Sequence, residues 1–399
     1  MRITFVIDRF SPKPGGVQTV VTELANKLSV THDVVVAIPE RTPRRGPQDT
    51  LEETGRAWKM LIHRPRHGAR LLSAPSRYVA LPVLRRYGHG RAGIPAARLF
   101  GAIGGRSLAF ALPHQPDIVH AFTADVTAHL ALGLGGAVGA PVVCTGFPHP
   151  GQYGDGPVDS AAYRRADGVV ALTSHDRAVY IGLGVVPDRI TVIPPPSNDL
   201  GTSGRTAARE RLRIFGPLAV FAGVRRDYKG ADILHAAAPA IGARVEDATV
   251  AFVGPGPALS ALPGITIRDT GEVDASTMAD WIRAADVLVL PSLYESCSIV
   301  VLEAWSAGVP VVTSDIPALK HLVDVSGAGV TVPRHPDPLA AAVADLLHDD
   351  TRREALGRSG RAFWQTHCAL ETIVAAHEEL YARLGSGQYK GPGMARQRR

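Results

Sequence analysis

Short apolar runs alternate with amphipathic stretches along the chain, and this order predicts parallel strands joined by helices. The run at 2–7 is almost wholly apolar, and from Val17 to Leu28 the apolar residues share one face at helical spacing. Asp33 to Ile38 then reads as a second buried strand. Further runs of strand length follow at 117–121, 141–145, 168–172 and 189–193. This order is typical of an α/β domain with a parallel sheet.

The second half of the chain repeats the pattern. Strand-like runs lie at 217–222, 248–253, 286–290, 309–313 and 327–332, and helical patterns at 336–348, 351–366 and 370–384. Three prolines at 194–196 precede a Gly- and Ser-containing segment, which is typical of a linker. We therefore expect two domains, 1–198 and 199–370. The Gly-rich basic end, 385–399, is predicted to be disordered.

Composition is that of a soluble globular protein, with 45% hydrophobic and 20% charged residues. No apolar run approaches the roughly 18 to 20 residues of a membrane span, and the start MRITFVIDRF reads as a strand rather than a signal peptide. The three cysteines, Cys144, Cys297 and Cys368, have neither metal-site spacing nor a disulfide framework. A reducing, cytoplasmic location is the expectation.

Positive charge is concentrated between Arg41 and Arg106, where 14 Lys or Arg stand against three acidic residues. The segment has no nucleic-acid-binding motif and few aromatic residues between the cations, which argues against a nucleic-acid partner. An anionic membrane surface or a negatively charged acceptor fits better. A merely solvated insertion is the alternative.

The most informative stretch runs from Pro291 to Thr313. It reads as the end of a strand, a loop, a helix over about 298–307 and a second strand. Glu295 lies in the loop beyond the carboxyl end of its strand, where open α/β sheets bind ligands. Glu303 lies within an otherwise apolar helix, where a carboxylate is costly unless it is hydrogen-bonded. The alternative for Glu303 is a helix position that faces water.

A second charged loop follows the strand at 217–222. It holds Arg225, Arg226 and Lys229, and Gly230 comes directly before the next predicted helix. Three cations this close repel one another unless an anion lies between them, and a diphosphate would supply it. The alternative is an ordinary solvated loop.

A glycine pair lies in the loop after the first predicted strand of the chain. Gly15 and Gly16 stand between the strand and its amphipathic helix, where backbone N–H groups can approach an anion. The alternative is that the pair only makes a tight turn.

Taken together, these motifs resemble those of glycosyltransferase family 4, the retaining sugar-nucleotide transferases of the GT-B fold. The resemblance implies two Rossmann-like domains facing each other across a cleft, with a last helix, 371–384, returning to the first domain. It implies that Glu295 contacts the transferred sugar, that Glu303 holds the ribose, and that Ser296, Cys297, Ser298 and Ile299 lie against the donor. Ser296 to Ser298 replaces a turn that is Gly-Phe-Gly-like in many members.

The resemblance also implies that Lys229, with either Arg225 or Arg226, grips the donor diphosphate, and that Gly15 and Gly16 lie against its phosphates. Two strand-end histidines, His120 and His149, are candidates for contact with the reacting sugars, although a histidine in such a place is more often structural. Phe122 and Phe147 occupy positions where a histidine is expected.

The predicted function is therefore transfer of a hexosyl group from a nucleoside-diphosphate sugar to an acceptor hydroxyl, with retention implied by the resemblance. We favour a UDP-sugar, with a GDP-sugar as the second option, although base contacts through the main chain leave no mark in the sequence. The acceptor stays open between a small molecule, a natural product and a lipid-linked saccharide. No Asp-x-Asp metal motif stands in a suitable loop, so we expect neither metal nor cofactor. We expect a cytoplasmic protein, with peripheral contact to an anionic membrane through 41–106. The alternatives are a catalytically silent homologue acting as a partner protein and a sugar-nucleotide epimerase.

Overall fold

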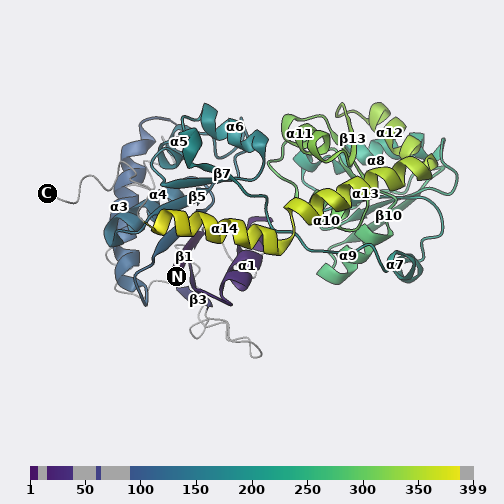
Figure 1. Ribbon diagram of the computed structural model, residues 1–399. Coiled ribbons are helices and arrows are strands. Elements are labelled where there is room, and N and C mark those ends of the chain that lie inside the picture. Colours follow the sequence, from purple (N-terminus) through teal and green to yellow (C-terminus); the bar gives the residue numbers. More distant parts are fainter. Residues whose placement is uncertain (8–15, 39–59, 64–89, 387–399) are drawn as a thin grey trace. The chain divides into compact units, whose positions relative to one another are not determined.

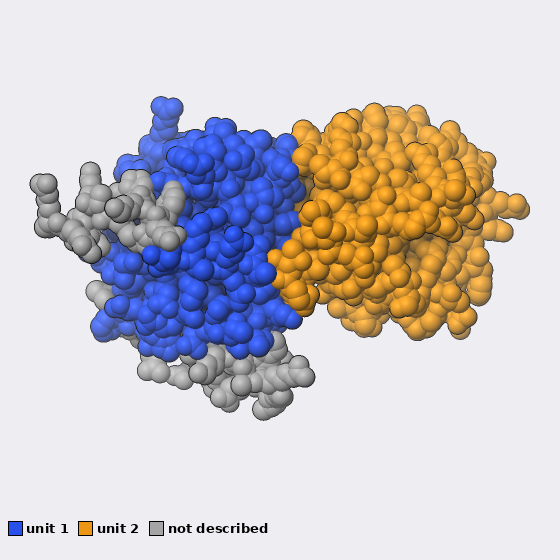
Figure 2. Space-filling view, viewed as in Figure 1, with its two compact units in different colours: residues 1–194, 373–399 blue, residues 195–372 orange. Residues whose placement is uncertain are grey.

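The computed structural model describes residues 1–7, 16–38, 60–63 and 90–386. The chain forms two compact units, residues 1–194 with 373–399 and residues 195–372 (Figures 1 and 2). The break between Pro194 and Pro195 falls inside the proline run, whereas the sequence placed it near residue 198. Most of the basic segment 41–106 and most of the C-terminal tail lie outside the described residues.

Unit 1 is built on a parallel sheet in the order β3-β2-β1-β4-β5-β6-β7. Its strands are β1 Arg2–Ile7, β2 Asp33–Ala37, β3 Met60–His63, β4 Ile118–Phe122, β5 Val142–Thr145, β6 Gly168–Ala171 and β7 Ile190–Val192. The strands predicted from the apolar runs are confirmed, and β3 was not anticipated. Strand order reverses between β1 and β4, which makes this pair the topological switch point of the sheet.

The helices of unit 1 are α1 Gly16–Leu28, α3 Gly93–Ala111, α4 Val126–Val138, α5 Pro157–Tyr163, α6 Ser174–Gly182 and α14 Leu370–Gly385, with a short 3-10 helix at Pro187–Arg189. Helix α14 comes last in the chain, yet it lies along unit 1 (Figure 1). It buries Ile373, His377, Leu380 and Tyr381 there. Its apolar face, rather than its place in the sequence, therefore decides to which unit it belongs.

Unit 2 has a six-stranded parallel sheet in the order β10-β9-β8-β11-β12-β13. Its strands are β8 Leu218–Ala222, β9 Thr249–Val253, β10 Thr266–Gly271, β11 Val287–Leu290, β12 Val311–Ser314 and β13 Gly329–Val332. Its helices are α7 Arg205–Leu212, α8 Ala231–Gly242, α9 Ala275–Ala284, α10 Ile299–Ser306, α11 Pro317–Ser326, α12 Pro336–His348 and α13 Asp350–His367, with a 3-10 turn at Asp227–Lys229. The switch point here lies between β8 and β11.

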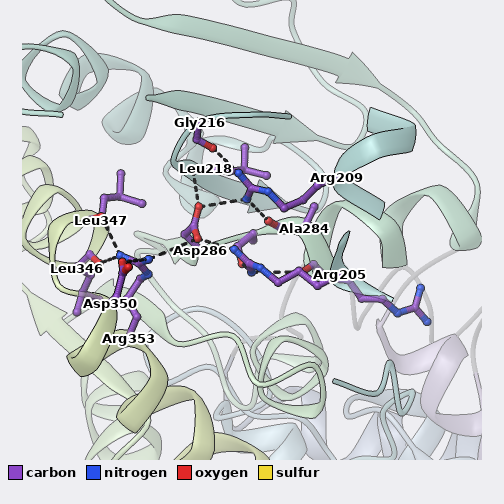
Figure 3. A network of polar contacts seen from close by, with 12 residues as sticks. Arg205, Arg209, Gly216, Leu218, Ala284, Asp286, Leu346, Leu347, Asp350 and Arg353 are labelled. Carbon is purple, nitrogen blue, oxygen red and sulfur yellow. Dashed lines mark hydrogen bonds and ion pairs between the residues drawn. The ribbon is translucent and has the colours of Figure 1, made fainter. Parts of the chain in front are cut away.

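An ion-pair network fixes the amino ends of these two central strands (Figure 3). Asp286, directly before β11, accepts a hydrogen bond from the backbone N–H of Leu218 at 2.7 Å. Its carboxylate is paired with Arg205, Arg209 and Arg353. The network ties helices α7 and α13 to the sheet at the edge opposite the carboxyl ends, which leaves those ends to carry a site.

Among the described helices, none combines the length and the apolar character that a membrane crossing needs.

Candidate functional site

The loops that follow β8 and β11 are joined at the switch point of unit 2. The backbone N–H of Leu293 donates to the Tyr228 carbonyl at 2.6 Å, and Arg334 Nε donates to the Pro291 carbonyl at 3.0 Å. Gly230 has φ +75°, and a Cβ on it would stand 2.1 Å from the Pro291 oxygen. Only glycine fits this approach, so the Lys-Gly dipeptide noted in the sequence has a structural reason.

A lysine and a glutamate meet where these loops touch. Lys229 Nζ lies 2.5 Å from Glu295 Oε1, with side-chain exposures of 22% and 7%. Ser292 Oγ donates to the same carboxylate oxygen at 3.0 Å. Beside the pair, the rings of Tyr228 and Tyr294 stack with their centroids 4.4 Å apart. The structure thus brings together two residues that stand 66 positions apart in the sequence.

The two arginines of the charged loop have different surroundings. The Arg225 side chain is buried, paired with Asp269 at 2.5 Å and donating to the Gly256 carbonyl at 3.3 Å. Arg226 is exposed, and its guanidinium makes no hydrogen bond or ion pair within the part of the chain that the structure describes. Of the alternatives left open by the sequence, the geometry therefore favours Arg226 as the cation that meets a ligand.

Glu303 is partly buried on α10 and has one partner. Asn198 Nδ2 donates to its Oε1 at 2.7 Å. Burial raises the pKa of the Glu303 carboxyl, and the hydrogen bond from Asn198 opposes that rise. The Glu303 side chain is therefore hydrogen-bonded rather than fully solvated, and Asn198, which holds it, is exposed.

The start of α10 lies beside Glu295. Ser296 and Ser298 are buried, Cys297 is half-buried, and Ile299, the first residue of the helix, is half-buried. Within the described chain, the Ser298 side chain does not cap the helix. The first N–H groups of a helix need acceptors and carry partial positive charge, so this end suits an anion.

Unit 1 carries backbone strain at the carboxyl edge of its own sheet. Thr123 (φ +108°) and Asp125 (φ +65°) follow β4, and Phe147 (φ +50°) follows β5. A positive φ is uncommon for a residue with a side chain, so these loops are candidates for a functional role. The strained loops adjoin the switch point between β1 and β4. Of the predicted glycine pair, Gly16 begins α1 and is exposed, and Gly15 lies outside the described residues.

The two candidate histidines differ in placement. His120 is fully buried, with Nδ1 2.7 Å from the Tyr381 hydroxyl and Nε2 2.7 Å from Thr145 Oγ1. Burial drives its pKa well below the ordinary value, so the ring is neutral. This placement favours the structural role over contact with a ligand. His149 is half-buried, and its Nδ1 lies 2.9 Å from the carbonyl of the strained Phe147.

Two family models match the chain, one mainly over unit 1 and one within unit 2. The model described as Glycosyltransferase Family 4 matches residues 14–198, and the model described as Glycosyl transferases group 1 matches residues 216–349. The chain belongs to glycosyltransferase family 4. The two matches contain the candidate residues of both sheets, from the glycine pair to Glu303.

Curated relatives of this chain include proteins named D-inositol 3-phosphate glycosyltransferase. The one from Xylanimonas cellulosilytica is 35% identical over 240 residues, covering 55% of this chain and 57% of the relative. The one from Thermobispora bispora is 35% identical over 215 residues, covering 48% and 50%. The chain spans about half the length of the curated relatives it matches.

Solved structures show that the fold is GT-B. Sucrose-phosphate synthase from Thermosynechococcus elongatus superposes with a TM-score of 0.72 at 20% identity, over 97% of this chain and 100% of that one. Anabaena HepE in complex with UDP gives 0.70 at 16% identity, over 96% and 100%. At these identities the likeness concerns the fold alone.

Sequence reasoning missed three residues that hold the candidate site residues in place. Ser292 holds Glu295, Asn198 holds Glu303, and Asp269 holds Arg225. Ser292 was within the motif, and its place beside a loop carboxylate was the available signal. Asn198 and Asp269 lie far from their partners in sequence, and without the sheet order nothing pointed to them.

Proposed function

We propose that this glycosyltransferase transfers a hexosyl group from a nucleoside-diphosphate sugar to an acceptor hydroxyl, with retention of configuration and without a metal ion. The observation that carries the proposal is the Lys229–Glu295 pair at the switch point of unit 2, beside the uncapped start of α10. UDP-sugars are the favoured donors and GDP-sugars the second option. Anabaena HepE has been solved in complex with UDP and with UDP-glucose, which supports the first choice.

The cations of the site match the needs of a departing diphosphate. In the proposed reaction the bond between sugar and phosphate breaks, the sugar carbon bonds the acceptor oxygen, and the hydroxyl proton leaves with the nucleoside diphosphate. The leaving group gathers negative charge, so positioned cations and N–H groups accelerate the step. Lys229, the exposed Arg226 and the first N–H groups of α10 fill this role, with each charge-assisted hydrogen bond worth about 1.5–3 kcal/mol.

The two carboxylates take the hydroxyls of the donor. Glu295, next to the lysine, accepts hydrogen bonds from the transferred sugar. Glu303 accepts them from the ribose, in place of the Asn198 amide that it binds in the free protein. Binding therefore replaces partners that the protein already provides, and neither carboxylate is left unpaired at any stage.

Acceptor binding is assigned to unit 1. The strained backbone at Thr123, Asp125 and Phe147 lies on loops at the carboxyl edge of its sheet. His149 is retained as a candidate contact through its bond to Phe147. His120 is proposed to support these loops from the core.

Calorimetry tests the donor half of the proposal. Purified protein is titrated with UDP, GDP and ADP in EDTA and then with Mg²⁺, and tight UDP binding in EDTA is the expected result. Absence of binding to all three would contradict the proposal and favour a silent homologue. Binding that needs the metal ion would refute metal independence.

Turnover measurements test the second half of the proposal, which is transfer of the sugar to an acceptor. UDP release from UDP-glucose is followed with a panel of hydroxyl acceptors that includes D-inositol 3-phosphate, the compound in the names of the relatives. Release that depends on an acceptor is expected, whereas release without one would indicate an epimerase or a hydrolase. Lys229→Ala should cut the rate severely. Lys320→Ala is the matched control, because Lys320 lies on α11 in an exposed pair with Asp324.

A further inference from the structure

Unit 1 holds a cavity that the proposed transfer does not use. It has a volume of about 350 Å³ and is lined by Arg98, Ala102, His129, Gly133 and Arg165. Arg98 and Ala102 belong to α3, His129 and Gly133 belong to α4, and Arg165 follows α5. The cavity is thus lined by α3, α4 and the chain just after α5, and none of its lining residues belongs to the strained positions that follow β4 and β5.

The residues that line this cavity carry positive charge without a negative charge to balance it. Two guanidinium groups face it, and no carboxylate is among its lining residues. Over the ranges that the structure describes, neither the Arg98 nor the Arg165 side chain makes an ion pair or a hydrogen bond. Burial lowers the pKa of Arg165, and the neighbouring Arg98 lowers it further. Both side chains are exposed, so water screens part of the repulsion between them, and an anion bound between the two guanidinium groups would relieve the rest.

A buried histidine adds an unsatisfied acceptor to the wall. His129 is 1% exposed, and its Nε2 donates to the Val158 carbonyl at 3.0 Å. Its Nδ1 then carries a lone pair, and this atom is buried with no hydrogen-bond partner in the described chain. An unpaired buried polar atom is costly, so a wall that retains one calls for an explanation. Because this atom is closed to solvent, it makes the wall polar without being a contact that a ligand has to make.

Close packing of α3 on α4 fixes the geometry of the cavity. A Cβ on Gly133 would lie 1.8 Å from the Gly101 oxygen, and a Cβ on Gly101 would lie 2.2 Å from the His129 oxygen. Glycine is required at both positions for the helices to approach this closely. Arg98 and His129 are therefore held on rigid, touching helices, which favours a preformed site.

We propose that Arg98 and Arg165 form a binding site for a phosphate group, with His129 in its wall. The phosphate belongs either to a free phosphate ester or to the headgroup of an anionic lipid. Guanidinium groups suit phosphate because they form paired, charge-assisted hydrogen bonds with its oxygens. The exposed Leu99 and Phe110, at 51% and 88% on the same helix α3, are the reason for testing the lipid source.

Calorimetric titration with inorganic phosphate and glycerol 3-phosphate tests the site directly. The double variant Arg98→Gln/Arg165→Gln should raise the Kd of at least one probe by about tenfold or more. Arg106→Gln is the matched control, because Arg106 is exposed on the same helix and does not line the cavity. Ala102→Glu is a second variant that places a carboxylate in the cavity, and it should weaken binding to a similar degree.

Sedimentation with vesicles distinguishes a lipid headgroup from a free phosphate ester as the source of the phosphate group. Vesicles of phosphatidylcholine are compared with vesicles of equal parts phosphatidylcholine and phosphatidylglycerol. Loss of binding to the anionic vesicles in the double variant, but not in Arg106→Gln, supports a lipid headgroup. An effect confined to the soluble probes supports a free ester. The proposal is overturned if the double variant matches Arg106→Gln in both assays, or if wild type binds neither kind of probe.

Circular dichroism melting curves check the folding of every variant, and UDP binding is measured in each as a check on the donor site. UDP binding depends on residues of unit 2 and should be unchanged. A failed phosphate site would leave UDP binding intact, whereas a failed donor proposal would leave the phosphate titrations intact, so the two failures are distinguishable.

Discussion

Replacement of Glu295 by glutamine should tighten the binding of UDP while slowing transfer. In the free protein the Glu295 carboxylate holds Lys229, the cation that the diphosphate needs. The carboxylate also repels the diphosphate. Glutamine keeps the size of the side chain and removes both effects, so Lys229 becomes available without first breaking an ion pair.

The size of the expected change in UDP affinity follows from how exposed the Lys229–Glu295 ion pair is. Fully exposed pairs contribute about 0.2–1 kcal/mol, whereas breaking a buried pair costs about 3–5 kcal/mol. With 22% of the lysine and 7% of the glutamate side chain exposed, this pair lies between the two cases. We therefore expect the free energy of UDP binding to become more favourable by about 1–2 kcal/mol, which is about a five- to thirtyfold decrease in the Kd of UDP.

The rate of glycosyl transfer should fall in Glu295→Gln, although UDP binds more tightly. The glutamine no longer offers a charged acceptor to the sugar, and losing one charge-assisted hydrogen bond of about 1.5–3 kcal/mol lowers kcat/KM roughly 10- to 150-fold. The assay is calorimetry with UDP alongside UDP release from UDP-glucose. Glu246→Gln, an exposed carboxylate of unit 2 near the start of β9, is the control and should change neither quantity. Weaker UDP binding in Glu295→Gln would refute the reasoning.

Three further predictions concern other charged groups. Glu303→Ala should weaken UDP binding by about tenfold in calorimetry, because the ribose loses an acceptor that is now held by Asn198. Asp176→Asn should change the pH dependence of unfolding. Burial raises the pKa of Asp176 to about 7, so its contribution is full below about pH 4 and is lost as the pH rises through 7. The stability of wild type relative to this variant should therefore fall by up to about 1.4 kcal/mol per pH unit between pH 5 and 6.5. Asp286→Ala should destabilise unit 2 by about 3 kcal/mol in urea, because three arginines and the Leu218 N–H lose their partner.

Each of these predictions has a contrary result. Unchanged UDP affinity in Glu303→Ala would remove that residue from the donor site. Parallel stability–pH profiles of wild type and Asp176→Asn, followed by circular dichroism in urea, would show that Asp176 does not titrate near neutrality. For Asp286→Ala, the fluorescence of the buried Trp281, Trp305 and Trp364 reports on unit 2. The exposed pair partner Asp324 provides the control, and an equal effect in Asp324→Ala would contradict the assigned role of the network.

The sequence by itself determined the elements and the chemical types in the loops. Apolar runs of strand length, and helical spacing such as that from Val17 to Leu28, depend on neighbours along the chain, and the structure confirms the strands and helices that they predicted. Whether a residue follows the carboxyl end of a strand is likewise determined by its neighbours along the chain. For that reason Glu295 and Lys229 could be selected as candidates before any strand order was known.

Only the tertiary structure decided which of these groups meet. Strand order places β8 beside β11, and so joins Lys229 to Glu295. Burial by distant segments separated Arg225, which pairs with Asp269, from the exposed Arg226, and it enclosed His120 under helix α14. Adjacent arginines look alike in a sequence because their difference arises from residues 31 and 44 positions away. Pairing and burial are properties of contacts between segments, and a pattern along one segment does not contain them.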